Sequence, residues 1–130
     1  MILDTSAVLA ILKDEPESSP FAEVIERIRV RRISAVTLFE TSIVADRNEN
    51  PALSQAVDEF MTLIQPIIEP VTEAQAWIAR RAYREYGKGS GHPAQLNFGD
   101  CFSYALAKDR DEPLLFKGND FIHTDVRTMV

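Results

Sequence analysis

The stretch LNFGDCFSYALAK, residues 96 to 108, has the clearest pattern in the chain. Its apolar side chains recur at the spacing of one helical face: Phe98, Cys101, Phe102 and Ala105. This spacing predicts a helix packed into a core. Asp100 falls in the first turn, and Asn97 is a good N-cap for which an acid three residues later completes a capping box. Capping alone explains Asp100, so a catalytic interpretation needs further acids close to it.

Outward from this helix, short apolar runs alternate with helical patterns. We expect strands at residues 1–4, 31–36, 66–71 and 112–118, and helices at residues 5–12, 18–29, 37–48, 51–64 and 72–86. Strands separated by helices predict an α/β fold with a largely parallel sheet. The chain shows no repeat, low-complexity segment or linker, so we expect one domain over residues 1–130.

The composition is that of an ordinary globular protein, with 45% apolar and 26% charged residues. A single cysteine excludes an internal disulfide and fits a reducing compartment. The apolar start lacks a basic region and contains Asp4, which is against a signal peptide. No run approaches the roughly 20 apolar residues of a membrane helix. We therefore expect a cytoplasmic protein with no membrane partner.

The net charge of −6 is unusual for a protein that binds nucleic acid. The basic residues are concentrated, however, in residues 27–32 and 80–89. The second run interleaves two tyrosines with four basic residues: Arg80, Arg81, Arg84 and Lys88. Such a surface can bind phosphates and stack bases. A solvated helix face with half-buried tyrosines explains the run equally well.

Four acids occupy corresponding places in the predicted fold. Asp4 ends the first strand, Glu40 follows the second, Asp100 opens the helix before the last strand, and Asp120 follows that strand. Ligands of open parallel sheets bind beyond the carboxyl ends of the strands. Asp4, Glu40 and Asp120 should reach this edge, and Asp100 joins them if its helix begins there.

Converging carboxylates repel one another unless a cation lies between them. Oxygen ligands without histidine or thiolate suit Mg²⁺, or alternatively Mn²⁺. Such an ion can activate water and hold a phosphate oxygen during hydrolysis. Each acid also has a structural explanation. Asp4 can cap a helix, Glu40 can form a capping box with Thr37, and Asp120 can belong to a turn.

The chain resembles the PIN-domain ribonucleases, specifically the VapC toxins of bacterial toxin–antitoxin pairs. The resemblance lies in ILDTSAVLAIL at the start, Glu40, HPAQLNFGDCFSYALAK, and LLFKGNDF followed by Thr124-Asp125. It covers nearly the whole chain, and LNFGDCFSYALA with KGNDF is its most specific part. It implies a PIN-like three-layer α/β/α sandwich with a short, mostly parallel central sheet.

The resemblance also implies an activity: a Mg²⁺-dependent endoribonuclease that cuts structured RNA such as tRNA or ribosomal RNA, forms a homodimer and is silenced by a VapB antitoxin. By position, Asp4 and Asp100 would be the principal metal ligands. Glu40 and Asp120 would complete the catalytic site. Ser6 and Asn97 would be polar supports.

Two other functions remain open. A Mg²⁺-dependent phosphotransfer or phosphatase domain also places acids at strand ends, although Asp4 has no neighbouring acid here. A catalytically inactive module that binds RNA or protein is the second alternative. Cys101 and Trp77 are best explained as core residues, and His92 and His123 have no partner by spacing.

Overall fold

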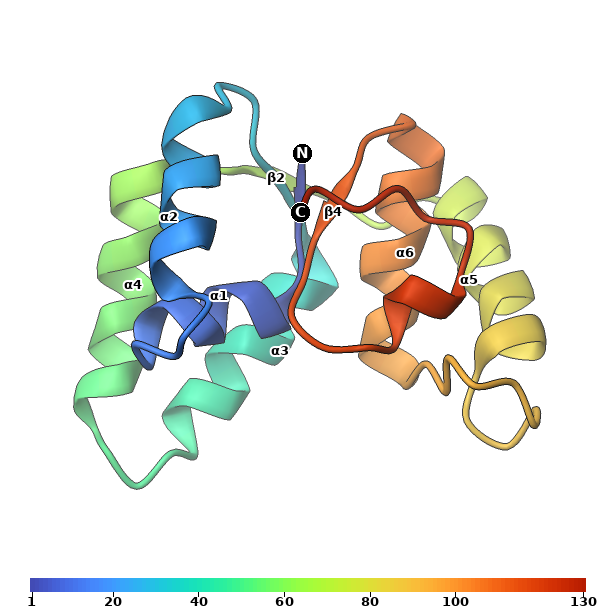
Figure 1. Cartoon of the computed structure of the whole chain (residues 1–130), viewed down its shortest axis with the longest axis horizontal. Coiled ribbons are helices and arrows are strands. Elements are labelled where there is room, and N and C mark those ends of the chain that lie inside the picture. Colours follow the sequence, from blue (N-terminus) through green and yellow to red (C-terminus); the bar gives the residue numbers. More distant parts are fainter.

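A computed structural model describes all 130 residues and shows an α/β/α sandwich around a short parallel sheet (Figure 1). The sheet has four strands, β1 (Ile2–Leu3), β2 (Arg32–Ser34), β3 (Ile67–Glu69) and β4 (Leu114–Leu115). All pairings are parallel, and the order is β3-β2-β1-β4. The expected α/β class and parallel sheet are confirmed, although each strand is shorter than predicted.

Helices cover both faces of this sheet. The first three strands are connected by α1 (Thr5–Leu12), α2 (Ser18–Arg27), α3 (Ala35–Asp46) and α4 (Ala52–Ile64). The chain then passes through α5 (Glu73–Tyr86) and α6 (Phe98–Arg110) to β4, and a short 3-10 helix, η1 (Phe121–His123), follows. Figure 1 shows α5 and α6 on one side of the strands, with α1, α2 and α4 on the other. None of these helices is long and apolar enough to cross a membrane.

The neighbouring strands β1 and β4 are wholly buried, although each has only two residues. Successive strand residues point to opposite faces of a sheet. Ile2 and Leu114 therefore pack into the core beneath α5 and α6, whereas Leu3 and Leu115 pack into the core beneath α1 and α2. Each strand thus joins both cores, which explains its continuous apolar sequence.

The direction of chain winding reverses beside β1. The chain moves from β1 to β2 and β3 on one side, and then returns to place β4 on the other side of β1. Crevices for ligands form at such reversals, beyond the carboxyl ends of the strands. Asp4 is the first residue after β1, so it lies at the reversal.

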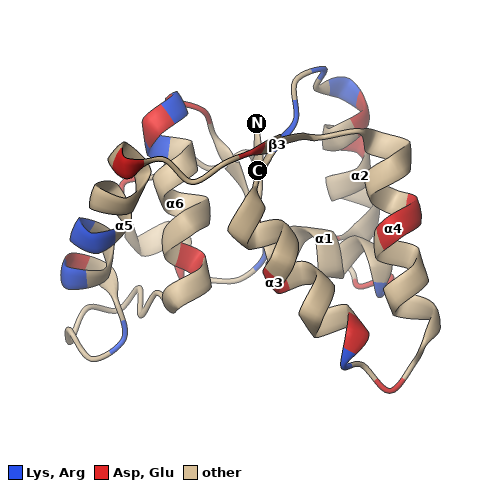
Figure 2. Ribbon diagram, turned by 180° about the vertical axis from the view of Figure 1, so that it is seen from behind, with Lys and Arg blue, Asp and Glu red and all other residues tan.

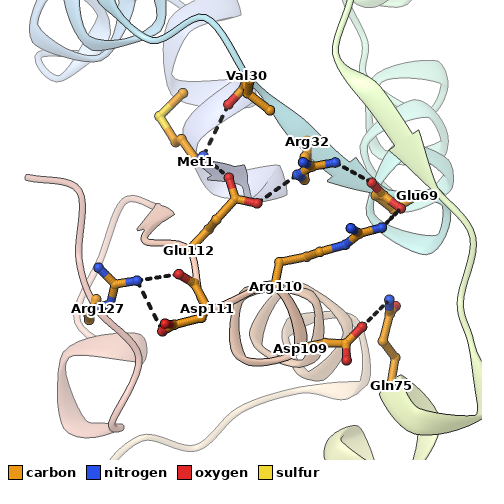
Figure 3. A network of polar contacts seen from close by, with 10 residues as sticks. All are labelled: Met1, Val30, Arg32, Glu69, Gln75, Asp109, Arg110, Asp111, Glu112 and Arg127. Carbon is orange, nitrogen blue, oxygen red and sulfur yellow. Dashed lines mark hydrogen bonds and ion pairs between the residues drawn. The ribbon is translucent and has the colours of Figure 1, made fainter.

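A network of ion pairs lies around Met1 and Arg32, at the amino ends of β1 and β2, and extends to Glu69 at the end of β3 (Figure 3). Glu112 accepts from the Met1 amino group at 2.6 Å and from Arg32 at 2.7 Å. The buried carboxylate of Glu69 accepts from Arg32 at 2.6 Å and Arg110 at 2.7 Å. Glu69 and Glu112 therefore each pair with two cationic groups.

Three local predictions were wrong. Phe98 is 74% exposed and Trp77 53% exposed, so neither is the core residue expected, whereas Cys101 and Ala105 are buried as predicted. The helix that follows the second strand, α3, is capped by Ser34 and not by Thr37. The Ser34 Oγ accepts from the Val36 amide. Thr37 lies inside α3, and Glu40 consequently falls in its second turn without a capping box.

Candidate active site

Asp4 is buried and firmly held at the start of α1. As the N-cap, its Oδ2 accepts from the Ser6 amide at 3.0 Å and from the Ser6 hydroxyl at 2.6 Å. Its Oδ1 accepts from the hydroxyl of Ser103, on α6, at 2.6 Å. Hydroxyl donors on both oxygens fix the direction of this carboxylate without neutralising its charge.

Asp100 does form the capping box with Asn97. The Asn97 side chain accepts from the Asp100 amide at 2.8 Å, and Asp100 Oδ2 accepts from the Asn97 amide at 3.0 Å. Burial raises the pKa of Asp100 from 3.8 to about 7, against the lowering effect of the Asn97 amide. The charges of Asp4, Glu40 and Asp120 raise this pKa further. All four acids are therefore close enough to interact electrostatically at Asp100.

Glu40 reaches the same region from α3. Its Oε1 accepts from the Thr5 hydroxyl at 2.7 Å, while Oε2 lies against the backbone of Gly99. Burial raises the pKa of Glu40, the Thr5 hydrogen bond lowers it, and the charge of Asp4 raises it again. Glu40 takes no part in helix capping, so the capping box with Thr37 that the sequence pattern suggested does not explain this acid.

Asp120 is the most exposed of the four acids. It lies beyond β4 at the start of η1, and its side chain makes no capping hydrogen bond. Its charge nevertheless reaches Asp100. The place of Asp120 in a turn accounts for it structurally, but its side chain also brings a fourth negative charge to the same edge of the sheet.

A buried network of hydroxyls supports the acids, and sequence reasoning missed it. The Ser103 hydroxyl donates its one proton to Asp4. The 3.0 Å hydrogen bond between the Thr37 and Ser103 hydroxyls is therefore donated by Thr37. Thr41 lies 3.0 Å from Thr5, the residue that donates to Glu40. Thr37, Thr41 and Ser103 are fully buried. Small hydroxyl residues on the inward faces of α3 and α6 were the available signal.

The four acids have no cationic partner, in contrast to Glu69 and Glu112 of Figure 3. Every ion pair in the protein involves other acids. No three acid, histidine or cysteine side chains stand close enough to enclose an ion by themselves. Mg²⁺ needs no such cage, because it takes one or two carboxylates and keeps several waters. Hard carboxylate oxygens held by hydroxyl donors fit this ion.

The proposed supporting residues contact the acids directly. Ser6 donates to Asp4 and accepts from the Lys117 amide at 3.0 Å, which ties the segment after β4 to α1.

Cys101 adjoins Asp100 in sequence, but burial raises the pKa of its thiol to about 11. The Nδ1 of His92 accepts from the Ala94 amide within its loop. Neither of these last two residues is a catalytic group by geometry.

Basic residues of the second run lie along α5 and in the loop after it (Figure 2). All four are exposed: Arg80, Arg81, Arg84 and Lys88. Arg80 lies over the Trp77 ring and borders a largely apolar groove of about 210 Å³ between α5 and α6, where Tyr83 and Phe98 also contribute. By contrast, Arg31 and Arg32 of the first run are bound to backbone carbonyls and to acids, so these two arginines have a structural role.

Comparison with known proteins identifies the class to which this fold and acidic edge belong. The model of the PIN domain family matches residues 1–127. Ribonuclease VapC28 of Mycobacterium tuberculosis is 54% identical over 98% of this chain and 96% of its own length. Ribonuclease VapC42 of the same species is 46% identical over 98% and 97%. The chain therefore belongs to the PIN-domain family, among the VapC ribonucleases.

Solved structures share this fold. VapC20 of Mycobacterium tuberculosis, described as a Sarcin-Ricin loop cleaving toxin, has a TM-score of 0.73 at 16% identity, covering 96% of this chain and 95% of its own. VapBC2 of Rickettsia felis, bound to a DNA fragment from its promoter, also has a TM-score of 0.73 at 16% identity, covering 98% and 94%. At such identities the likeness concerns the fold.

Proposed function

We propose that this chain, as a single PIN domain over residues 1–130, is the toxin of a type II toxin–antitoxin system. Its activity is the Mg²⁺-dependent endonucleolytic hydrolysis of phosphodiester bonds in structured RNA, such as tRNA or ribosomal RNA. The observation that carries the proposal is the convergence of four unpaired acids at the reversal of the sheet. The VapC ribonucleases that match almost the whole chain support it.

Asp4 and Asp100 would hold the ion, with Glu40 and Asp120 completing the site. When bound, Mg²⁺ (or Mn²⁺) polarises the phosphodiester and supplies an activated water. Ser6 on α1 and Ser103 on α6 both donate to the Asp4 carboxylate and would orient it, as hydrogen-bonded supports do for metal ligands. Asn97 holds Asp100 through the capping box.

Hydrolysis would proceed without a covalent enzyme intermediate. Cys101 is the one thiol, and its raised pKa of about 11 keeps it protonated at neutral pH. The serines beside the acids already donate to Asp4. They therefore serve as supports, and water is the attacking group.

RNA would contact the basic side chains of α5 and the following loop: Arg80, Arg81, Arg84 and Lys88. These exposed cations can bind phosphates, while Tyr83 among them and Trp77 one turn earlier are 45% and 53% exposed and can stack on bases. The net charge of −6 makes such a local basic surface necessary for RNA binding.

The partners would be a cognate VapB-type antitoxin and a second copy of this chain, in the cytoplasm. Structures with this fold include a toxin–antitoxin complex from Klebsiella pneumoniae, which supports the antitoxin. An acidic edge without cations would attract arginine from such a partner, because arginine pairs with carboxylates in a bidentate manner. An inserted arginine would thereby replace the metal ion.

The direct test is cleavage of a structured RNA by the purified chain. Activity should need Mg²⁺ and stop in EDTA, and Asp4→Asn and Asp100→Asn should be folded but inactive. Full activity in both variants would refute the proposal. Formation of a beryllofluoride adduct, an analogue of an acyl phosphate, would instead identify a phosphotransfer domain. Metal binding seen by calorimetry without RNA cleavage would indicate an inactive module.

A further inference from the structure

The second residue of α6, Gly99, is a buried glycine in an otherwise well-formed helix. Glycine is a poorer helix former than alanine, because it loses more backbone freedom on folding. Gly99 does not have the left-handed backbone that elsewhere requires glycine, as at Gly89, Gly91 and Gly118. Its conformation therefore does not explain why a side chain is missing.

The space beside Gly99 is filled by the carboxylate of Glu40. A Cβ atom built on Gly99 would lie 2.0 Å from Glu40 Oε2, 2.6 Å from Cδ and 2.8 Å from Oε1. All three distances are far inside van der Waals contact. Alanine at this position and the present placement of the Glu40 carboxylate therefore exclude each other.

We propose that Gly99 is a positioning residue for Glu40. Because Gly99 has no side chain, the Glu40 carboxylate can occupy the space beside it and approach Asp100 at the start of α6. This inference rests on the proposed function of the acidic edge. The Thr5 hydroxyl holds the other carboxylate oxygen at 2.7 Å, so Glu40 is fixed between α1 and α6. Gly99 itself touches neither metal nor RNA.

A methyl group on Gly99 should move Glu40 and leave the fold intact, because the carboxylate is the free end of a flexible side chain. We expect Gly99→Ala to lower Mn²⁺ affinity, measured by calorimetry, and kcat by about 10- to 100-fold, as losses of metal-site supports do. KM for RNA should change little, because the basic surface on α5 is untouched.

A shorter acid provides the decisive control. Glu40→Asp alone should lower kcat, since its carboxylate falls short of the site. In the Gly99→Ala background the same change should raise kcat, because the shorter side chain avoids the methyl group. Adding Gly99→Ala to Glu40→Gln should have little further effect on kcat. Independent, multiplicative losses in both combinations would overturn the proposal.

A second measurement needs neither metal nor RNA. Thr5→Val removes the hydroxyl that holds Glu40, and it should lower the melting temperature of the parent chain. If Gly99→Ala has already displaced Glu40, Thr5→Val should lower the melting temperature less in that background. Equal decreases would refute the positioning role even in a chain that cleaves RNA. The predicted difference in a chain without nuclease activity would retain the positioning role and reject only the proposed function.

Discussion

At the scale of single residues, Asp4 and Glu40 are each held by a hydroxyl donor from a distant part of the chain. Asp4 illustrates this best, because its Oδ1 depends on Ser103, which lies 99 residues later in sequence. Supports of this kind set the direction of metal ligands and commonly affect affinity as strongly as some ligands do. The effects of individual substitutions should follow from these contacts.

Ser103→Ala should impair the site more than the fold. The change leaves Asp4 Oδ1 without its donor in a fully buried place, so the carboxylate can turn away from its functional direction. We expect Mn²⁺ affinity and cleavage to fall by about 10- to 100-fold. Calorimetry and RNA cleavage assays measure this. Ser42→Ala is the matched control, because that hydroxyl bonds only to the Leu38 carbonyl of its own helix; an equal loss there would contradict the prediction.

Asp100 should make the stability of the metal-free protein depend on pH. Its folded pKa of about 7 exceeds the ordinary 3.8, so the folded chain binds more protons than the unfolded chain between these values. Stability should therefore fall as pH rises from about 4 to about 7. Melting temperatures in EDTA measure this slope.

Asp100→Asn should reduce that pH slope, and a smaller one should remain from Glu40, whose pKa is also raised. Asp58→Asn on the exposed face of α4 serves as the control and should leave the slope unchanged. A slope in Asp100→Asn as steep as in the parent chain would show that another group titrates.

At the scale of elements, helix starts carry the site. Asp4 caps α1, and the first turn of α6 supplies Asn97, Gly99 and Asp100. Negative charge is stabilised at helix amino ends by the helix dipole. On the proposed function, the capping box would contribute to both folding and catalysis, and the sequence pattern alone could not separate the two.

Loss of a cap should affect function only at α6. Asn97→Ala and Thr72→Ala each remove an N-cap hydrogen bond, from α6 and α5 respectively, and should each cost about 1 kcal/mol of stability. Only Asn97→Ala removes the acceptor of the Asp100 backbone amide. The Asp100 carboxylate keeps its bond to the amide of residue 97, but the helix turn that positions it is loosened, so only this variant should lose cleavage activity. Urea unfolding and RNA cleavage measured on both variants provide the test. Equal activity losses would mean that stability alone is responsible.

At the scale of the whole molecule, charge is sorted between surfaces. Glu69 and Glu112 are paired with cations, Asp4, Glu40, Asp100 and Asp120 are unpaired, and α5 carries exposed arginines (Figure 2). On the proposed function, this division would let an acidic protein hold a cation in one place and RNA phosphates in another. It also predicts how RNA binding responds to salt.

Substituting Arg80, Arg81 and Arg84 by Gln should weaken RNA binding and flatten its dependence on salt. Each lost contact with a single-stranded phosphate should reduce the slope of log affinity against log salt by about 0.7. Filter binding to an inactive Asp100→Asn parent in Ca²⁺ at several salt concentrations measures this. The exposed Arg29 and Arg47 provide the control pair, and an equal effect from them would contradict a local binding surface.

Local periodicity and strand-end acids were enough to predict the parallel α/β fold and to select Asp4, Glu40, Asp100 and Asp120. This was possible because apolar spacing and chain direction are local properties of a sequence. Exposure of Phe98 and Trp77 was not predictable, because which face of a helix is covered depends on the helix packed against it. Tertiary structure alone brought Ser103 to Asp4 and Gly99 to Glu40, because these contacts join helices that are distant in sequence and close only after folding.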